Sequence, residues 1–267
     1  MDPRALLKDL QSHTLSLTHE VAPERTVTYA IDDSHELVIH EDDSGGVATV
    51  VWQAVLVQCR YMLRHGLGKP GGACLELAKG TVVELGAGTG FVGLFMAKYL
   101  AGGDVAESDR VLDQVYLTDI DAPKVMAVLD ANVAANGVAD VCTVAPLDWR
   151  APEEWSHTSS EAADGKPVPA HIVVCECVYN GYFHEALLAS LRHLAGSETL
   201  IHICFAERNP EGEAAFFVRA AELGFEVTKI ADDIVDACKS SNDAIGDNEA
   251  PVYLYMLQKA STPPAAS

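Results

Sequence analysis

From Gly80 to Gln258 the sequence alternates short apolar segments with amphipathic ones, and this alternation constrains the fold more than any other feature. Such an alternation is typical of a parallel sheet covered by helices on both faces. The expected strands are Thr81–Leu85, Gln114–Thr118, Val141–Ala145, His171–Cys175, Thr199–Ala206, Glu226–Ile230 and Val252–Gln258. The expected helices are Gly90–Leu100, Pro123–Asn136, His184–Leu194 and Glu211–Leu223. The sequence therefore predicts an α/β fold with a seven-stranded, mostly parallel sheet.

Ahead of this pattern lies a β-hairpin signature. The segments "TVTYAID" and "HELVIHE" alternate apolar and polar residues around a polar turn. The stretch 47–66 then has the periodicity of a helix that ends at Gly66. We expect an N-terminal extension with a helix and the hairpin over residues 1–46, a main domain over 47–259 and a disordered tail over 260–267.

The composition excludes several classes of protein. A formal net charge of −21 argues against nucleic acid as a partner, because phosphates would be repelled. No apolar run is long enough to span a membrane, and the N-terminus lacks the pattern of a secretory signal. We expect a monomer in the cytoplasm, with the nucleus as an alternative. The seven cysteines are scattered, which favours reduced thiols, and no spacing of Cys or His predicts a metal site.

The glycines of "ELGAGTGFVG" raise the question of which ligand they receive. Read from Gly88, they fit the G-x-G-x-x-G pattern of dinucleotide-binding folds, in which a helix N-terminus receives a pyrophosphate. However, Glu84 precedes them, and a negative charge beside a pyrophosphate is unfavourable. A cationic ligand such as S-adenosylmethionine would gain from it. A dinucleotide, or a glycine turn without a ligand, remains an alternative.

The same stretch resembles the first motif of class I S-adenosylmethionine-dependent methyltransferases, E/D-x-G-x-G-x-G, filled here by Glu84, Gly86, Gly88 and Gly90. The resemblance implies a Rossmann-like sheet and S-adenosylmethionine as the cofactor. Asp119 ends the next strand, where an acid can accept hydrogen bonds from ribose hydroxyls. A helix cap at Asp121 is the competing reading of the acids in this turn.

A tryptophan and an acid follow the third strand of the sheet, in "APLDWR". Trp149 could stack on adenine, with Asp148 near the adenine amino group. The alternative is a tryptophan that only anchors its loop.

The fourth strand runs into "VVCECVYNGYF", in which Glu176 and Tyr179 form E-x-x-Y. This resembles the D/E-x-x-Y/F signature of the family 16, methyltransferase-like 21 type enzymes, which methylate lysines of elongation factors, chaperones and related proteins. Members of the group often carry a W-x-A element before the first motif, and Trp52 fills it here, near the cofactor. Cys175, where Ala or Gly is more usual, is also placed beside the cofactor, and "NGYF" replaces the acidic residues expected after the motif.

Glu176 and Tyr179 are the residues that we expect to act on the acceptor. Methyl transfer from a sulfonium is an in-line displacement that needs alignment rather than a protein nucleophile. Glu176 could hold a lysine ammonium by charge, and Tyr179 could offer it a π-face. The alternatives are an acid that caps a helix or pairs with a basic residue, and a tyrosine packed in the core.

The leading hypothesis is therefore a protein-lysine N-methyltransferase whose partner is a protein with an accessible lysine, such as a translation or chaperone factor. A small-molecule N-methyltransferase is the second hypothesis, although no helical lid over the acceptor is evident in the N-terminal sequence. The third is a cofactor-binding protein that acts by interaction alone. A dehydrogenase is disfavoured because no constellation for hydride transfer follows in the second half of the sequence.

Overall fold

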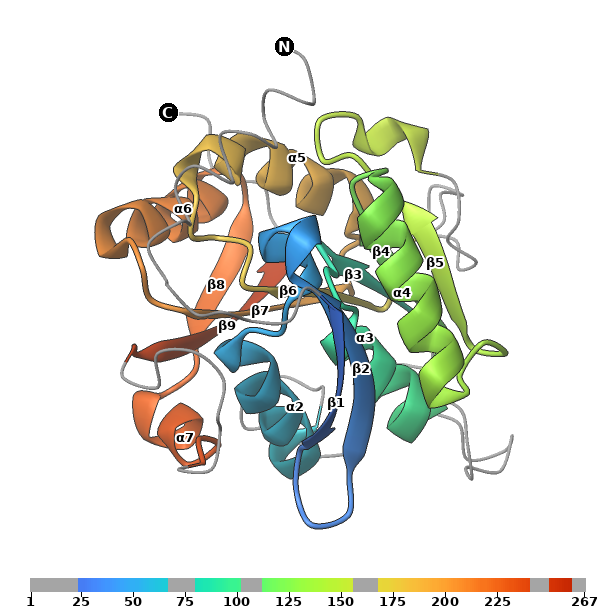
Figure 1. Cartoon of the computed structure of the whole chain (residues 1–267). Coiled ribbons are helices and arrows are strands. Elements are labelled where there is room, and N and C mark those ends of the chain that lie inside the picture. Colours follow the sequence, from blue (N-terminus) through green and yellow to red (C-terminus); the bar gives the residue numbers. More distant parts are fainter. Residues whose placement is uncertain (1–23, 67–79, 102–111, 156–167, 241–249, 261–267) are drawn as a thin grey trace.

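A single mixed sheet organises the chain, which a computed structural model describes over residues 24–66, 80–101, 112–155, 168–240 and 250–260 (Figure 1). Its seven strands lie in the order β5-β4-β3-β6-β7-β9-β8, and β9 alone runs in the opposite direction to the other six. The bounds are β3 Gly80–Leu85, β4 Leu112–Asp119, β5 Cys142–Pro146, β6 His171–Cys175, β7 Leu200–Ala206, β8 Phe225–Lys229 and β9 Val252–Lys259. The predicted seven-stranded, mostly parallel sheet is confirmed, with each strand within two residues of its expected ends.

The strand order creates a switch point at β3. From β3 the chain steps outward to β4 and β5, and then returns to β6 on the other side of β3. Leu85 pairs with Thr118 of β4 and with Val174 of β6, so the three strands end side by side. In open α/β sheets ligands bind outside the carboxyl ends of the strands at such a point. The loops after β3, β4, β6 and β7 therefore meet at one edge.

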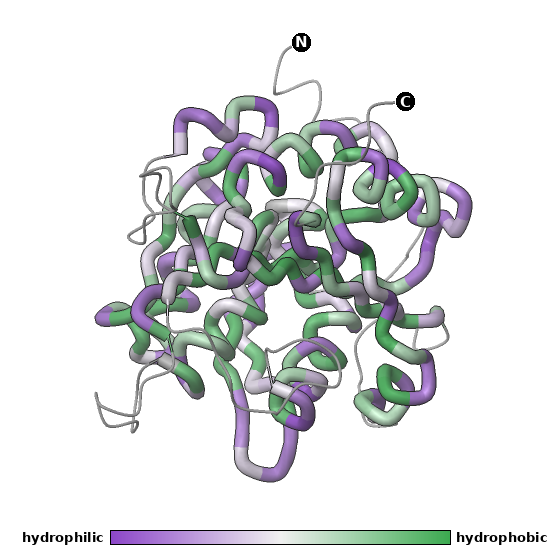
Figure 2. The backbone as a smooth tube through the Cα atoms, turned by 180° about the vertical axis from the view of Figure 1, so that it is seen from behind, coloured by the Kyte–Doolittle hydropathy of each residue, from purple (hydrophilic) through white to green (hydrophobic). Residues whose placement is uncertain are grey.

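Helices cover both faces of the sheet. One core cluster joins the sheet to the helices below it and at its right-hand side in Figure 1, and a second joins it to the helices above. The helices of the first face are α2 Gln53–His65, α3 Phe91–Met96, α4 Pro123–Asn136 and α7 Asp232–Asp236, and those of the second are α5 His184–Leu194 and α6 Pro210–Glu222. In Figure 2 green, apolar residues run through the central strands, and purple, hydrophilic residues gather in the outer turns, including the tip of the hairpin.

The helix ends lie at the residues that the sequence marks as helix starts and stops. Pro123 opens α4 and Gly137, in the left-handed region, closes it. The Asn209 side chain accepts a hydrogen bond from the Gly212 N–H at the start of α6. The helix expected over Gly90–Leu100 is instead a short α3 followed by a π-helical turn at Ala97–Ala101.

The N-terminal hairpin is confirmed as β1 Glu24–Ala30 paired with β2 Glu36–Asp42. It packs on α4, where Asn132 and Asn136 each form hydrogen bonds with the backbone of β2. The Glu41 carboxylate is buried and accepts hydrogen bonds from Arg25, Tyr29 and the Val51 N–H. The hairpin thus holds the following segment against the sheet.

The helix predicted over 47–66 is wrong in its first third. Val47–Thr49 is a 3-10 turn, Trp52 is extended, and α2 begins only at Gln53. The cause is tertiary, because the Val51 N–H bonds to Glu41 and the Trp52 indole donates to the Val47 carbonyl at 2.8 Å. The predicted end at Gly66 is confirmed.

Some expectations lie outside the described residues. These are the helix expected within residues 1–23 and the tail from residue 261 onward. The helix α7 was not expected, since its residues belong to a stretch of loop-like composition. In the described parts of the chain, none of the helices has the length and hydrophobicity required to cross a membrane.

Candidate functional site

The loop between β3 and α3 can be built only from glycines at its key positions. Gly86, Gly88 and Gly90 have φ values of 66°, 58° and 78°, in the left-handed region that side chains rarely adopt. A Cβ on Gly88 would lie 2.6 Å from the Ala48 carbonyl oxygen. The backbone of this loop is thus bare of side chains at the carboxyl edge of the sheet, and at Gly88 the close approach is made by the Ala48 carbonyl of the same chain.

Glu84 lies beneath this loop rather than in it. Its carboxylate is buried and accepts a hydrogen bond from the Gly93 N–H at 2.9 Å, in the first turn of α3. Burial raises the pKa of Glu84 to about 8, although the bonds from the N–H groups of Val92 and Gly93 act in the opposite direction. Glu84 therefore orders the glycine loop by capping α3 from inside.

Asp119 closes the loop from the neighbouring strand. At the end of β4 its carboxylate accepts hydrogen bonds from the Gly88 N–H at 2.9 Å and from the Ile120 N–H at 2.7 Å. Burial raises the pKa of Asp119, and these two hydrogen bonds lower it. The helix-capping alternative at Asp121 is not realised, because Ala122 is the N-cap of α4 and α4 has no side-chain cap.

Trp149 lies against the glycine loop on the β5 side. A Cβ on Gly86 would lie 2.9 Å from Cζ2 of the Trp149 ring. Asp148 is paired with Arg150 at 2.5 Å, and this pair lowers the pKa of Asp148. Both predicted residues are thus at the expected edge, but the Asp148 carboxylate already has a basic partner.

Of the two cysteines in "CEC", Cys177 rather than Cys175 faces the loop. The Cys175 side chain is buried in the core under α2, beside Cys204. The Cys177 thiol lies 3.5 Å from the Leu85 carbonyl oxygen and 3.7 Å from that of Gly86. Sequence reasoning missed Cys177, although its place after the end of a central strand was a usable signal.

Glu176 sits in a strained conformation at the end of β6. Its φ of 59° is the only positive value of a non-glycine residue among the described residues. Strain of this kind costs on the order of 1–3 kcal/mol and tends to gather at functional sites. The turn aims the carboxylate at the N–H groups of Ala54 in α2, at 3.1 Å, and of Ala206 in β7, at 3.3 Å.

The same carboxylate also has a basic partner that sequence reasoning missed. Arg208, which follows β7, donates from Nη1 to Glu176 Oε2 at 2.5 Å. Its guanidinium carbon lies 4.8 Å from the ring centroid of Trp52 and 6.0 Å from that of Tyr179. The alternative reading of Glu176, an acid that caps a helix and forms an ion pair, is thus realised in this structure.

Tyr179 is largely buried near this ion pair. Burial raises the pKa of the Tyr179 hydroxyl. Together with Trp52 it places an aromatic ring beside a cation whose counter-charge is Glu176, a combination that stabilises cations. We call the group formed by Trp52, Glu176 and Tyr179 the cation site.

The cation site and the glycine loop are neighbours, because the same two segments of the chain contact both. The segment 47–52 contacts the loop at Gly88 through the Ala48 carbonyl, and it ends at Trp52 in the cation site. On the other side, Cys177 contacts Gly86 and directly follows Glu176 in the chain. One edge of the sheet thus carries both a bare glycine loop and a site for a positive charge.

This combination defines the class of protein as a methyltransferase that uses S-adenosylmethionine. The residues present fit that cofactor, because the Asp119 carboxylate at the end of β4 can accept hydrogen bonds from ribose hydroxyls and the amino-acid end can approach the bare glycine backbone. A pyrophosphate would instead meet the Asp119 carboxylate beside the Gly88 N–H. Glu84 adds little negative charge near neutral pH, because burial beneath the loop raises its pKa to about 8.

Comparison with known proteins identifies the family. The family model described as lysine methyltransferase, methyltransferase family 16, matches residues 31–222. The mouse EEF1A lysine methyltransferase 3 is 31% identical over 72% of this chain and 71% of its own length. The zebrafish (Danio rerio) protein N-lysine methyltransferase METTL21A is 30% identical over 70% of this chain and 72% of its own. The chain belongs to this family of protein-lysine N-methyltransferases, and S-adenosylmethionine is its cofactor.

More distant matches add little to this assignment. The protein-lysine N-methyltransferase EFM3 of Chaetomium thermophilum is 26% identical over 67% of this chain and 50% of its own. Among solved structures, an rRNA methylase from Streptococcus thermophilus aligns over 79% of this chain and 99% of that chain with a TM-score of 0.48 and 9% identity, too low to carry an argument.

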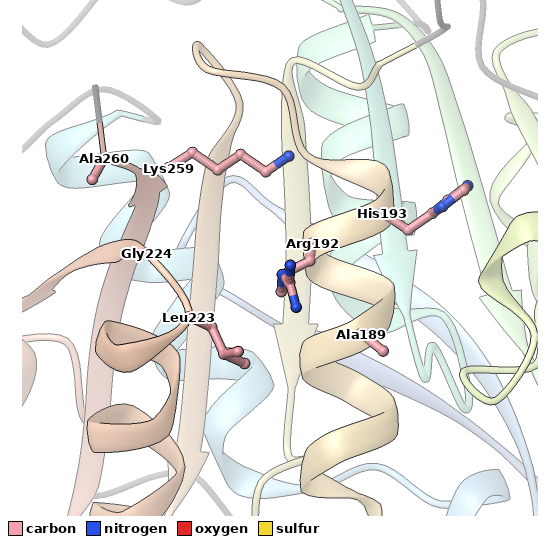
Figure 3. A pocket seen from close by; sticks show the side chains of 7 residues that line it. All are labelled: Ala189, Arg192, His193, Leu223, Gly224, Lys259 and Ala260. Carbon is pink, nitrogen blue, oxygen red and sulfur yellow. The ribbon is translucent and has the colours of Figure 1, made fainter. Parts of the chain in front are cut away.

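A surface pocket of about 510 Å³ lies elsewhere on the molecule (Figure 3). It is lined by the carboxyl-terminal end of α5, the turn after α6 and the end of β9, including Arg192, His193 and Lys259. Because β9 is antiparallel to β7, its end lies where β7 begins. The pocket is therefore at the opposite edge of the sheet from the cation site.

Proposed function

We propose that this enzyme methylates a lysine of a translation elongation factor and that the acceptor ammonium enters the cation site. The observation that carries the proposal is the group of Trp52, Glu176 and Tyr179 around a positive charge beside the glycine loop. The acceptor class is that of the mouse relative and of its counterpart in Xenopus tropicalis, both of which are EEF1A lysine methyltransferases. The net charge of −21 favours a basic target surface.

The residues divide between cofactor and acceptor. We assign the cofactor to the glycine loop, with Asp119 on the ribose side, Trp149 and Asp148 on the adenine side, and Trp52 between cofactor and acceptor. For Cys175 we propose a backbone contribution, because its side chain is buried whereas its carbonyl contacts the Cys177 thiol at 3.1 Å. We also propose that the enzyme acts as a monomer in the cytoplasm or nucleus, with the main domain over 47–259.

S-adenosylmethionine supplies an electrophilic methyl group on a sulfonium. The chain supplies alignment, since an in-line displacement requires the amine nitrogen to be held on the axis of the bond that breaks. A lysine must also lose its proton, which costs about 4–5 kcal/mol near neutral pH. Glu176 attracts the ammonium and Tyr179 limits the space around it, while water accepts the proton.

Transfer of labelled methyl groups to proteins of a eukaryotic cell lysate tests the proposal. We expect one discrete labelled band that contains methyl-lysine and comigrates with elongation factor 1A. Glu176→Gln keeps the shape of the side chain and removes its charge, so labelling should fall about ten- to a hundred-fold, the range for a hydrogen bond to a charged group. Glu185→Gln, an exposed acid on α5, is the matched control and should label normally.

Two further variants separate binding from transfer. Gly88→Arg should abolish cofactor binding measured by calorimetry, because a side chain there would collide with the Ala48 carbonyl oxygen and is disfavoured at a φ of 58°, so the loop would have to change shape. Tyr179→Phe should keep most activity and Tyr179→Ala should lose it, since the π-face rather than the hydroxyl is used. Full turnover in Glu176→Gln would contradict the role of that carboxylate, and a labelled band other than an elongation factor would contradict the acceptor class.

A further inference from the structure

Arg208 fills the cation site in this structure. It follows the end of β7, and its guanidinium reaches back over the edge of the sheet to Glu176, Trp52 and Tyr179. These are the three side chains that the proposed function assigns to the acceptor lysine or its surroundings. The chain thus places one of its own cations where an external cation is required.

The way in which Arg208 is held differs from that of a structural arginine in the same protein. Arg60 is buried and donates from Nε to the Ile31 carbonyl at 2.6 Å and from Nη1 to the Cys238 carbonyl. The side chain of Arg208 forms hydrogen bonds with the described residues only through Nη1, to Glu176 and to the Ala206 carbonyl at 3.3 Å. Its side chain is 34% exposed. Arg208 thus contacts the carboxylate through a single nitrogen and lies beside aromatic rings. A lysine ammonium, which is a compact point charge, is bound in the same way.

The backbone of Arg208 is anchored independently of its side chain. The N–H groups of Arg208 and Asn209 donate to Glu213 Oε1 at 3.0 and 3.1 Å, at the start of α6. Rotation of the side chain therefore moves the guanidinium without moving β7 or α6.

We propose that Arg208 occupies the acceptor site as an internal pseudosubstrate, and that the lysine of the protein substrate must displace its guanidinium from Glu176 before transfer. The proposal rests on the proposed function, because it takes the cation site as the acceptor site. The Glu176 side chain is only 6% exposed, and it contacts the Arg208 guanidinium and the N–H groups of Ala54 and Ala206. A lysine ammonium can therefore reach the carboxylate only in place of the guanidinium. An acceptor must therefore bind the enzyme strongly enough to displace Arg208, and an amine held only by its charge does not.

The first test uses the labelled band of the lysate experiment, with initial rates measured over a dilution series of lysate. If the guanidinium fills the site nine-tenths of the time, its removal raises the apparent affinity about ten-fold. In Arg208→Gln we therefore expect half-saturation at about ten-fold lower lysate concentration, with an unchanged plateau rate and unchanged affinity for S-adenosylmethionine. Arg219→Gln, an exposed arginine on α6 paired with Glu185 and Glu222, is the matched control.

The second test asks whether position 208 lies in the acceptor site. In Arg208→Lys the new amine should be methylated on the same chain when S-adenosylmethionine is added. Its lone pair forms the N–C bond, the C–S bond breaks with its electron pair retained by sulfur, and the proton passes to water. Peptide mass spectrometry should find methyl-lysine at position 208 and none at position 219 in Arg219→Lys.

An unmodified position 208 together with an unchanged or higher half-saturation in Arg208→Gln would overturn the proposal. A lower plateau in Arg208→Gln without a change in half-saturation would also overturn it, since that result indicates a structural clamp. Absence of any labelled band with the native enzyme would instead refute the proposed function, so the two failures are distinguishable. Thermal unfolding of each variant verifies that it is folded.

Discussion

The buried carboxyl of Glu84 makes a quantitative prediction about stability. Its pKa is raised to about 8 in the folded protein, whereas a glutamate in the unfolded chain titrates at 4.5. Between these values the folded protein carries the neutral acid and the unfolded chain carries the carboxylate, so folding takes up a proton. The stability contributed by Glu84 is therefore greatest at low pH and is lost as the pH rises from about 4.5 to about 8.

The magnitude follows from the two pKa values. Each pH unit within this window is worth about 1.4 kcal/mol. From about pH 5.5 to about pH 7 the native protein should thus lose about 2 kcal/mol through this one group. Glu84→Gln keeps an acceptor for the Gly93 N–H and cannot titrate. Its free energy of unfolding should therefore not show this decrease with pH.

The assay is urea unfolding followed by circular dichroism at a series of pH values, for the native protein and for Glu84→Gln. Other titrating groups cancel in the difference between the two free energies of unfolding. We expect the native protein to lose about 2 kcal/mol relative to the variant over this range. A difference that does not vary with pH would refute the reasoning, since it would mean that Glu84 is ionised in the folded protein.

Two further predictions concern the glycine loop and the core. Gly88→Ala should abolish S-adenosylmethionine binding in calorimetry, whereas Gly137→Ala, with a similar φ of 65° but open space around its Cβ, should lose only about 1 kcal/mol of stability and bind normally. His171 and His202 form a buried pair whose pKa values are lowered by burial to about 4 and about 3, so stability should fall as the pH drops below about 6.5. His202→Gln should reduce the steepness of that fall in acid unfolding curves, and an unchanged curve would count against a neutral buried pair.

The sequence was sufficient for the fold because the decisive signals are local. Strand-length apolar runs and helix-stop residues such as Gly66 and Gly137 act within a few residues of chain, so the expected elements agree with the observed ones. The glycine loop could be predicted for a similar reason, since glycine is the residue that adopts left-handed φ values most readily. By contrast, the start of α2 depends on the bond from the Val51 N–H to Glu41 in the hairpin, a contact between different elements.

For the candidate site, the sequence predicted where the residues lie but not which groups they contact. Its motifs placed Glu84, Asp119 and Glu176 at strand ends, but their bonding is decided by neighbours from other parts of the chain. Arg208 is 32 residues from Glu176 in sequence and carries no motif.

By itself the sequence determined the seven strands of the sheet, most of its helices, the glycine loop and the kind of chemistry at the edge of the sheet. Only the tertiary structure decided that Glu84 caps a helix from inside, that Cys177 rather than Cys175 faces the loop, and that Arg208 occupies the cation site. The physical reason is that backbone conformation is governed by adjacent residues, whereas desolvation and charge pairing depend on which distant side chains the fold brings within a few ångströms.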